Sequence, residues 1–387
     1  MDQSKSPQAD ARLFEPLALR GLVLKNRVMT SPMAMYSAPE GFANDFHLVH
    51  LGRFALGGAA LVFIEATAVS PEARITHGCV GLWRDAQKAP LQRIVAFLHR
   101  QGAAAGMQLG HSGRKGSARR PWHGGAPLDE SDAAERGETE WPLVSSSASP
   151  FAEGWPVPAE LDEAELDELV ADYARAAARA RECGFDVIEL HCAHGYLLHS
   201  FLSPLGNERG DAYGGTLENR MRLPLRVAEA VRAEWPDNRP MFARISSVDG
   251  VGVGWSLEDS IAFARALKAR GIDAIDCSSG GMMLPRENVL VARSPGFHVP
   301  FAAEIRRKAE IPTIAVGLIR EPTHAEEILA DGSADLIALA REMLFEPNWA
   351  ARAALELTGD AGWALWPDQF RYWLERRARA LAKAQAR

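Results

Sequence analysis

The sequence lacks several features that mark whole classes of protein. It has four cysteines in 387 residues, and they are too far apart for a disulfide framework or an iron–sulfur cluster to be expected. We expect them to be reduced and mostly buried. No run of 18 or more apolar residues occurs, so no membrane-spanning helix is expected. The cysteines are Cys79, Cys183, Cys192 and Cys277.

An excess of positive charge is absent as well. The formal net charge is −7, whereas proteins that bind nucleic acids carry a basic surface, so we expect no nucleic-acid partner. Residues 1–12 are polar and lack the apolar core of an export signal. We therefore predict a disordered N-terminus over residues 1–12 and a cytoplasmic protein with no membrane contact.

What the sequence does contain is a regular alternation of short apolar runs and amphipathic stretches. Runs that are apolar throughout indicate strands of a parallel sheet covered by helices, and eight strand–helix units are what a (β/α)₈ TIM barrel requires. An open, doubly wound sheet is the alternative, but no G-x-G-x-x-G motif follows the first strand. The predicted strands are residues 24–33, 61–66, 105–109, 186–191, 241–246, 273–277, 312–316 and 334–339.

The predicted helices lie between these strands. Thr216 and Ser256 are expected to be N-caps of two of them, because each is followed three residues later by a polar partner. The helices are predicted over residues 47–57, 85–102, 163–183, 216–235, 256–270, 300–310 and 321–331.

The barrel is predicted to form one domain over residues 13–360. Residues 114–160 interrupt the alternation after the third strand, and they are rich in glycine, proline, tryptophan and charge. A loop of that length in a compact domain usually has a function, such as a lid or a binding loop. Residues 361–387 follow as a C-terminal tail, which we expect to contact a partner subunit, and its basic part, residues 371–387, is predicted to form a surface helix.

Polar and unusual residues gather where the predicted strands end, which is where a barrel carries its chemistry. The most informative end is that of the fourth strand, with His191, His194 and Tyr196. Two imidazoles and a phenol in one turn can polarise a carbonyl-like oxygen and protonate the neighbouring carbon. A zinc site would need further ligands, so we predict no metal; histidines satisfied within the core are the remaining alternative.

Other strand ends carry groups that suit an anion. Ser279, Gly280 and Gly317 with Arg341 match the phosphate site of many barrels, although the glycines alone would also fit a flexible turn. Arg244 ends the fifth strand, where a buried guanidinium needs an anion, an electron-rich group or a structural ion pair. Lys115 is expected to contact an anion rather than to form a Schiff base.

These residues occur in motifs that resemble the old yellow enzyme family of FMN-dependent ene-reductases, in particular its thermophilic-like branch of xenobiotic reductases. The resemblance extends from about Leu13 to Trp373. The motifs are Ser31-Pro32-Met33-Ala34-Met35-Tyr36-Ser37, His111-Ser112-Gly113-Arg114-Lys115, His191-Cys192-Ala193-His194-Gly195-Tyr196, and the asparagine-, arginine- and glycine-rich segment 207–220.

The resemblance implies non-covalent FMN at the barrel mouth. His191 and His194 would bind the oxygen of a substrate's carbonyl or nitro group, Tyr196 would donate the proton, and Tyr36 would shape the substrate site. Ser31, Pro32, Met33, Ala34, Ala66 and Gln108 would line the isoalloxazine ring, Arg244 would lie at its N1/C2 edge, and Ser279, Gly280, Gly317, Ala340 and Arg341 would hold the ribityl chain and phosphate.

The resemblance also implies an activity and an assembly. NADPH or NADH would supply hydride in a ping-pong cycle that reduces the activated C=C bond of an α,β-unsaturated carbonyl or nitro compound, as in NAD(P)H dehydrogenases and enoate reductases. Arg371 and Trp373 would complete a neighbour's active site in a homodimer or dimer-built homotetramer. One departure is that Ala34 stands where the branch usually has cysteine, so we expect altered control of the flavin.

Three other functions remain open from the sequence. An iron–sulfur reductase of unsaturated acyl-CoA compounds would need cysteines and length that this chain lacks. A non-catalytic phosphate- or flavin-binding barrel would not need the proton donor Tyr196. An aldolase would work through Lys115 or a metal, and it would be colourless.

Overall fold

The computed structural model describes residues 11–283 and 291–386. Ten of the twelve N-terminal residues for which we predict disorder, and the last residue of the tail, lie outside the described residues. The described chain begins with a 3₁₀ helix, η1 (Arg12–Phe14), in which the Arg12 and Leu13 N–H groups donate to the carboxylate of Glu326. Within the described ranges, no helix combines the length and apolarity needed to cross a bilayer.

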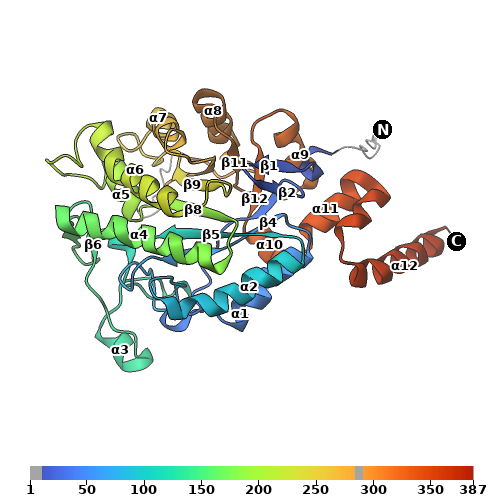
Figure 1. Cartoon of the computed structure of the whole chain (residues 1–387), viewed down its shortest axis with the longest axis horizontal. Coiled ribbons are helices and arrows are strands. Elements are labelled where there is room, and N and C mark those ends of the chain that lie inside the picture. Colours follow the sequence, from blue (N-terminus) through green and yellow to red (C-terminus); the bar gives the residue numbers. More distant parts are fainter. Residues whose placement is uncertain (1–10, 284–290, 387) are drawn as a thin grey trace.

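The centre of the molecule is a closed barrel of eight parallel strands surrounded by helices (Figure 1). Pairing of β12 with β3 closes the barrel, so the predicted TIM barrel is confirmed and the open sheet is excluded. The strands are β3 (Val28–Thr30), β4 (Leu61–Ala68), β5 (Ala104–Gly110), β8 (Val187–Cys192), β9 (Met241–Ser246), β10 (Ala274–Ser278), β11 (Thr313–Ala315) and β12 (Leu336–Leu339).

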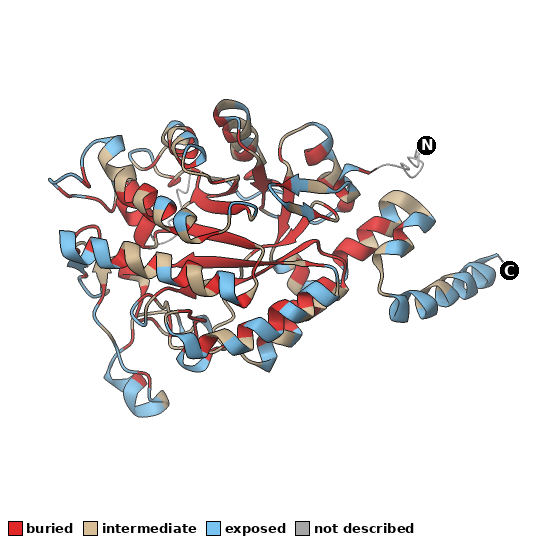
Figure 2. Ribbon diagram, viewed as in Figure 1, coloured by how far each residue is buried: buried red, intermediate tan, exposed pale blue. Residues whose placement is uncertain are grey.

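Each barrel strand is followed by a helix that packs on the outer face. Apolar residues fill the space between strands and helices, and Figure 2 shows the strands buried while the outer sides of the helices are exposed. The predicted caps are confirmed: Thr216 accepts from the Asn219 N–H, and Ser256 accepts from the Asp259 N–H. The covering helices are α1 (Asp45–Leu56), α2 (Lys88–Arg100), α4 (Glu163–Cys183), α6 (Leu217–Glu234), α7 (Leu257–Lys268), α8 (Val299–Ala309), α9 (Pro322–Ala330) and α11 (Trp349–Thr358).

The predicted first strand, residues 24–33, is wrong in its extent. The structure has an antiparallel hairpin of β1 (Leu17–Leu19) and β2 (Leu22–Leu24), and the barrel strand β3 begins only at Val28. Asn26 separates the two, because its side chain accepts from the Val28 N–H and donates to the Gly58 carbonyl. The leucines of the hairpin pack against the interior residues at the beginnings of the barrel strands. The hairpin therefore covers the amino-terminal end of the barrel.

Four further segments interrupt the strand–helix alternation. The long excursion after β5 contains η4 (Gly113–Lys115), η5 (Pro121–His123) and α3 (Glu130–Arg136), and β6 (Val144–Ser145) pairs there with β7 (Ala159–Glu160). A buried helix that we had not predicted, α5 (Leu197–Leu202), follows β8. Two more 3₁₀ turns are η2 (Pro39–Gly41) and η3 (Asp85–Gln87).

The chain ends in a helix that extends away from the barrel (Figures 1 and 2). After α10 (Arg341–Phe345) and α11, the 3₁₀ segment η6 (Gly359–Leu365) leads into α12 (Asp368–Gln385). No described residue of α12 is buried, which confirms the predicted surface helix. All four cysteines are buried and free, as expected.

Candidate active site

A large cavity opens at the carboxyl ends of the barrel strands. Its volume is about 1010 Å³, at the upper end of the range for ligand pockets. It brings together the predicted site residues Tyr36, Lys115, His194, Tyr196, Ser279, Gly280 and Arg341. The excursion after β5 supplies part of the wall through Phe151 and Trp155, whose rings lie 5.1 Å apart.

His191 and His194 meet at the end of β8. The Nδ1 atom of His194 lies 3.3 Å from Nε2 of His191, and the ring centroids are 5.1 Å apart. The Ala193 N–H donates to Nδ1 of His191, so the ring proton of His191 lies on Nε2, the atom that faces His194. The pair therefore presents two nitrogen atoms toward one point.

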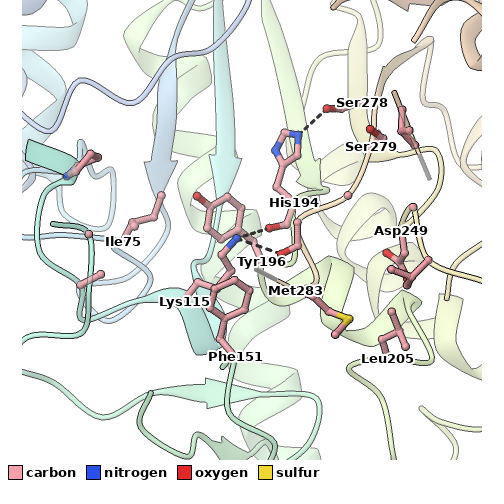
Figure 3. A pocket seen from close by; sticks show the side chains of 18 of the residues that line it. Ile75, Lys115, Phe151, His194, Tyr196, Leu205, Asp249, Ser278, Ser279 and Met283 are labelled. Atoms are coloured by element: carbon pink, nitrogen blue, oxygen red, sulfur yellow. Dashed lines mark hydrogen bonds between the residues drawn. The ribbon is translucent and has the colours of Figure 1, made fainter. Parts of the chain in front are cut away.

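The protonation of His194 is set by Ser278, at the end of β10. Its hydroxyl lies 2.6 Å from Nε2 of His194 (Figure 3). A hydroxyl can donate or accept, so Ser278 can donate to Nε2 and leave the His194 proton on Nδ1, next to Nε2–H of His191. In that tautomer both histidines are donors toward the same acceptor.

Both imidazoles are neutral at ordinary pH. Burial lowers the pKa of His191 and of His194 well below the usual histidine value, and the positive charge of Arg244 lowers both further. A neutral imidazole keeps one N–H donor without introducing a full charge. The two histidines are therefore uncharged before the reaction, and each can still donate an N–H hydrogen bond to a substrate oxygen as that oxygen gains negative charge.

Tyr196 stands beside the pair as a protonated phenol. Its ring centroid lies 5.0 Å from that of His191, and burial, followed by the nearby Tyr36, raises its pKa above the ordinary tyrosine value. The phenol thus holds its proton until a strongly basic carbon is close. Tyr36 has a left-handed backbone (φ 50°), and the Nε–H of Arg120 donates to its carbonyl oxygen at 3.0 Å.

Lys115 lines the cavity, and its contacts among the described residues are with backbone carbonyls and aromatic rings. Its Nζ donates to the backbone carbonyls of His194 at 2.8 Å and Gly281 at 3.2 Å (Figure 3). The ammonium group also lies 4.9 Å from the centroid of the Tyr196 ring and 4.6 Å from that of Phe151. Burial, together with the charge of Arg114, lowers the pKa of Lys115 to about 8. Lys115 therefore ties the end of β8 to the end of β10.

Comparison with known proteins agrees with this geometry. A family model described as the NADH:flavin oxidoreductase / NADH oxidase family matches residues 12–359. The chain belongs to this family. An NADPH dehydrogenase of Listeria monocytogenes is 45% identical over 349 residues, which cover 90% of this chain and 95% of the relative. The resemblance to old yellow enzyme is thereby confirmed, and the protein is an oxidoreductase of the FMN type.

Two solved structures of the old yellow enzyme type extend the comparison. Morphinone reductase in complex with tetrahydroNAD is 27% identical with a TM-score of 0.71, and the match covers 92% of this chain and 97% of the other. The old yellow enzyme homologue from Zymomonas mobilis is 26% identical with a TM-score of 0.69, and the match covers 87% and 90% of the two chains.

The inner wall of the site fits the FMN that this family implies. Arg244 is 8% exposed and donates to Ser31 Oγ at 2.8 Å, and its buried Nε has no hydrogen-bond partner among the described residues. Nε lies 3.5 Å from Asp276 Oδ2, so the structural ion pair that the sequence analysis considered is present, without a hydrogen bond between the two atoms. Gln108 donates its amide to Glu189 at 2.7 Å, which directs its carbonyl oxygen away from that contact.

The phosphate side also has room for a ligand. A Cβ atom built on Gly280 would have only the Asp249 carbonyl within 4 Å, at 3.8 Å, and Gly280 lines the cavity together with Ser279 and Arg341. Gly317 has a φ of 121°, a conformation that favours glycine. Ala66 lies in a small recess next to the main cavity, with His191 and Tyr196.

The structure does not bring every predicted residue to the cavity. Arg371 and Trp373 lie on the exposed helix α12, and Trp373 is 67% exposed. Within the described ranges, no group of three or more histidine, cysteine or acidic side chains is arranged to hold a metal ion.

Several supporting residues escaped the sequence analysis. Ser246 accepts from the His194 N–H at 3.0 Å and donates to the Gly280 carbonyl. His298 hydrogen-bonds Ser279 Oγ at 2.8 Å. His199 accepts from the Gly195 N–H. Of these residues, only His199 could have been noticed in the sequence, because a histidine among the leucines of α5 is unusual enough to suggest a role.

Proposed function

We propose that this protein is an ene-reductase that reduces the C=C bond of α,β-unsaturated carbonyl or nitro compounds, with FMN bound non-covalently and NADPH or NADH as the hydride donor. The observation that carries the proposal is the pair of neutral histidines, His191 and His194, whose facing nitrogens stand beside the protonated phenol of Tyr196. A relative named NADPH dehydrogenase and a neighbour solved with tetrahydroNAD support the nicotinamide donor.

The cofactor would lie across the barrel mouth. Arg244 would meet the N1/C2 edge of the ring with its guanidinium group, and Gln108 would offer its carbonyl oxygen to the ring's N–H. When bound, FMN supplies a hydride acceptor and donor in one site. The remaining contacts are assigned to Ser31, Pro32, Met33, Ala34 and Ala66 along the ring, and to Ser279, Gly280, Gly317, Ala340 and Arg341 at the ribityl chain and phosphate.

His191 and His194 bind the oxygen of the activating group in this proposal. As the β-carbon accepts hydride, charge moves onto that oxygen, and two preorganised N–H donors stabilise it more than they stabilise the uncharged substrate. Tyr196 then donates its phenolic proton to the α-carbon, while Tyr36 bounds the space beside the oxygen. The phenol can act because its raised pKa keeps the proton in place until the carbon becomes basic.

The C-terminal helix has a separate role in the proposal. Phe370, Tyr372 and Trp373 are exposed close together on α12, and a group of exposed apolar side chains is typical of an interaction surface. We assign Arg371 and Trp373 to the active site of a neighbouring subunit, which makes the protein a homodimer or a dimer-built homotetramer.

The first experiment is the visible spectrum of the purified protein, followed without oxygen through addition of NADPH and then of cyclohexenone. We expect a flavin band that bleaches with NADPH and returns with the enone. A colourless protein that takes up no added FMN would point back to an aldolase. Bleaching without return would support the reaction with NADPH but refute the proposal that an activated alkene is the substrate that reoxidises the flavin. A flavin band that NADPH leaves unchanged would favour a non-catalytic flavin-binding barrel.

A further inference from the structure

A buried histidine–aspartate pair lies directly behind the turn that carries His194 and Tyr196. His199 belongs to α5, and Asp249 lies in the loop between β9 and α7. Neither side chain is exposed, and Nε2 of His199 lies 3.1 Å from Oδ1 of Asp249, a close contact in which neither atom has a hydrogen bond to the described residues. In Figure 3, Asp249 lies at the cavity wall opposite Lys115.

The hydrogen bonds around His199 fix its tautomer. The Gly195 N–H donates to Nδ1 of His199 at 2.8 Å, so Nδ1 is an acceptor and the ring proton lies on Nε2, which faces Asp249. A histidine with protons on both nitrogens could not accept this bond. His199 therefore holds the Gly195 peptide only while it is neutral and in this one tautomer.

Asp249 is built to maintain that tautomer. Its Oδ2 accepts from the Ser203 hydroxyl at 2.5 Å and from the Trp255 N–H at 2.6 Å. Burial raises the pKa of Asp249, while the hydrogen bonds that Ser203 and the Trp255 N–H donate to it favour the charged carboxylate. The carboxylate is therefore ionised, and the oxygen that faces His199 is an acceptor with no proton of its own.

Gly195 is the point through which this pair can act on the chemistry. Its φ is 74° and that of the preceding His194 is 60°, so two successive residues are left-handed, which is rare outside glycine. A Cβ atom at Gly195 would lie 2.1 Å from the Gly281 carbonyl oxygen. Tyr196 follows at once, so a rotation of this peptide would move the phenol and the His194 ring together.

We propose that His199 is a positioning residue for the reaction: it holds the Gly195 peptide so that His194 and Tyr196 meet the substrate together, and Asp249 selects the tautomer that makes this possible. The inference rests on the proposed function. His199 contacts neither the substrate nor the cofactor site in this arrangement and acts through the backbone of the turn.

The test compares His199→Gln with His199→Leu. Glutamine can accept from the Gly195 N–H through its carbonyl oxygen and donate to Asp249 through its amide, whereas leucine can do neither. We expect the rate of flavin reoxidation by cyclohexenone to fall at least tenfold in His199→Leu and less than threefold in His199→Gln. The loss should exceed any loss in reduction by NADPH at least fivefold, because that step needs no proton from Tyr196.

Asp249→Asn tests the tautomer separately. An amide that turns its N–H₂ toward His199 forces the ring proton onto Nδ1, where it opposes the Gly195 N–H, so we expect a loss like that of His199→Leu. If leucine prevents folding, the contrast between Asp249→Asn and His199→Gln decides the question. Equal rates in His199→Leu and wild type, or equal losses in the glutamine and leucine variants, would overturn the inference.

Failure of the inference can be told from failure of the proposed function. A wild-type protein that cyclohexenone does not reoxidise refutes the proposed function. The positioning role is then judged by binding of p-hydroxybenzaldehyde, measured by calorimetry, because its phenolic oxygen can accept hydrogen bonds from His191 and His194 without any turnover, which loss of binding in the His191→Ala, His194→Ala double variant would verify. We expect at least fivefold weaker binding in His199→Leu and less than twofold in His199→Gln; equal affinities would count against the role.

Discussion

His191 Nε2 and His194 Nδ1 lie 3.3 Å apart at the end of β8, so one oxygen atom can be within hydrogen-bond distance of both. If this pair binds the substrate oxygen, replacing both residues with alanine should leave FMN content unchanged and remove most alkene reduction. We expect a loss of at least a hundredfold, the size found when oxyanion donors are removed. Single-turnover reoxidation by cyclohexenone measures it. The exposed residue His123 gives a matched control, His123→Ala, and full activity in the double variant would refute the assignment.

Tyr196→Phe separates proton transfer from oxygen binding. The ring that packs at 5.0 Å from His191 remains, but the proton is gone, so binding of the enone should change little. We expect reduction by NADPH to stay within threefold of wild type, and reoxidation by cyclohexenone to fall by about 10²–10⁴, the usual contribution of a general acid. Stopped-flow measurement of both half-reactions gives the answer. Equal loss in the two would show that Tyr196 has another role.

The fold could be predicted because its strands are apolar on both faces. A strand such as β12, in which every residue is apolar and buried, is visible as an apolar run, and eight strand–helix units leave few alternatives to a barrel. The β1–β2 hairpin could not be separated from β3 in the sequence. The break between them depends on a hydrogen bond from Asn26 to the carbonyl of Gly58, which is 32 residues away in the sequence. Helix α5 was missed because it has only six residues, all buried, and is too short to show a helical repeat of apolar and polar residues.

The sequence predicted those residues of the candidate site that are neighbours in the sequence. It did not predict contacts between residues that come from the ends of different strands. His191, His194 and Tyr196 belong to one turn, so their type and spacing indicated their chemistry. Ser278 reaches His194 from 84 residues away, and no local pattern shows that contact. The two carbonyls that converge on Nζ of Lys115 from different strand ends could not be foreseen for the same reason, and its anion contact stays a prediction.

Lys115 gives a pH dependence that can be tested. Its pKa of about 8 means that it is charged below that pH and neutral above it. A cation 4.9 Å from the Tyr196 ring stabilises the phenolate that forms as the proton leaves, so reoxidation by the enone should slow as the pH rises through about 8. Lys115→Met should be several-fold slower at pH 7 and should lack this alkaline decline. An unchanged decline in that variant would assign it to another group.

Ala34 offers a gain-of-function comparison. It is half-buried in the segment before Tyr36, at the position where the related branch usually has cysteine, and alanine cannot place a polarisable thiol against the flavin. We expect Ala34→Cys to change the flavin's reduction potential and the balance between its reduction and reoxidation rates. Redox titration and stopped-flow kinetics measure these, with Ala34→Ser as the control for size. An unchanged reduction potential and unchanged rates in Ala34→Cys would refute the prediction that residue 34 controls the flavin.

Glu65 makes the stability of the fold depend on pH. The side chain is 2% exposed, its Oε2 accepts from the Met35 N–H at 2.9 Å, and the nearest histidine, His47, lies 3.9 Å away. Burial raises the pKa of Glu65 to about 8, although backbone donors lower it somewhat, and burial lowers the pKa of His47 to about 4. His47 is therefore neutral and gives no compensating charge at pH 7.

The sign of the effect follows from linkage. The folded pKa of Glu65 lies above the unfolded value of about 4.3, so between these two pH values the native state binds more protons and the free energy of unfolding falls as the pH rises. Glu65→Gln keeps an acceptor for Met35 and cannot ionise. We expect the variant to match wild type at pH 4.5 and to be more stable at pH 8, by on the order of 1 kcal/mol or more. Urea unfolding with saturating FMN at both pH values measures this. The pKa of buried Glu189 is also raised to about 8, so the free energy of unfolding will depend on pH in both proteins. The decisive quantity is therefore the difference between wild type and Glu65→Gln in the slope of the free energy of unfolding against pH. Equal slopes would mean that ionisation of Glu65 does not destabilise the fold.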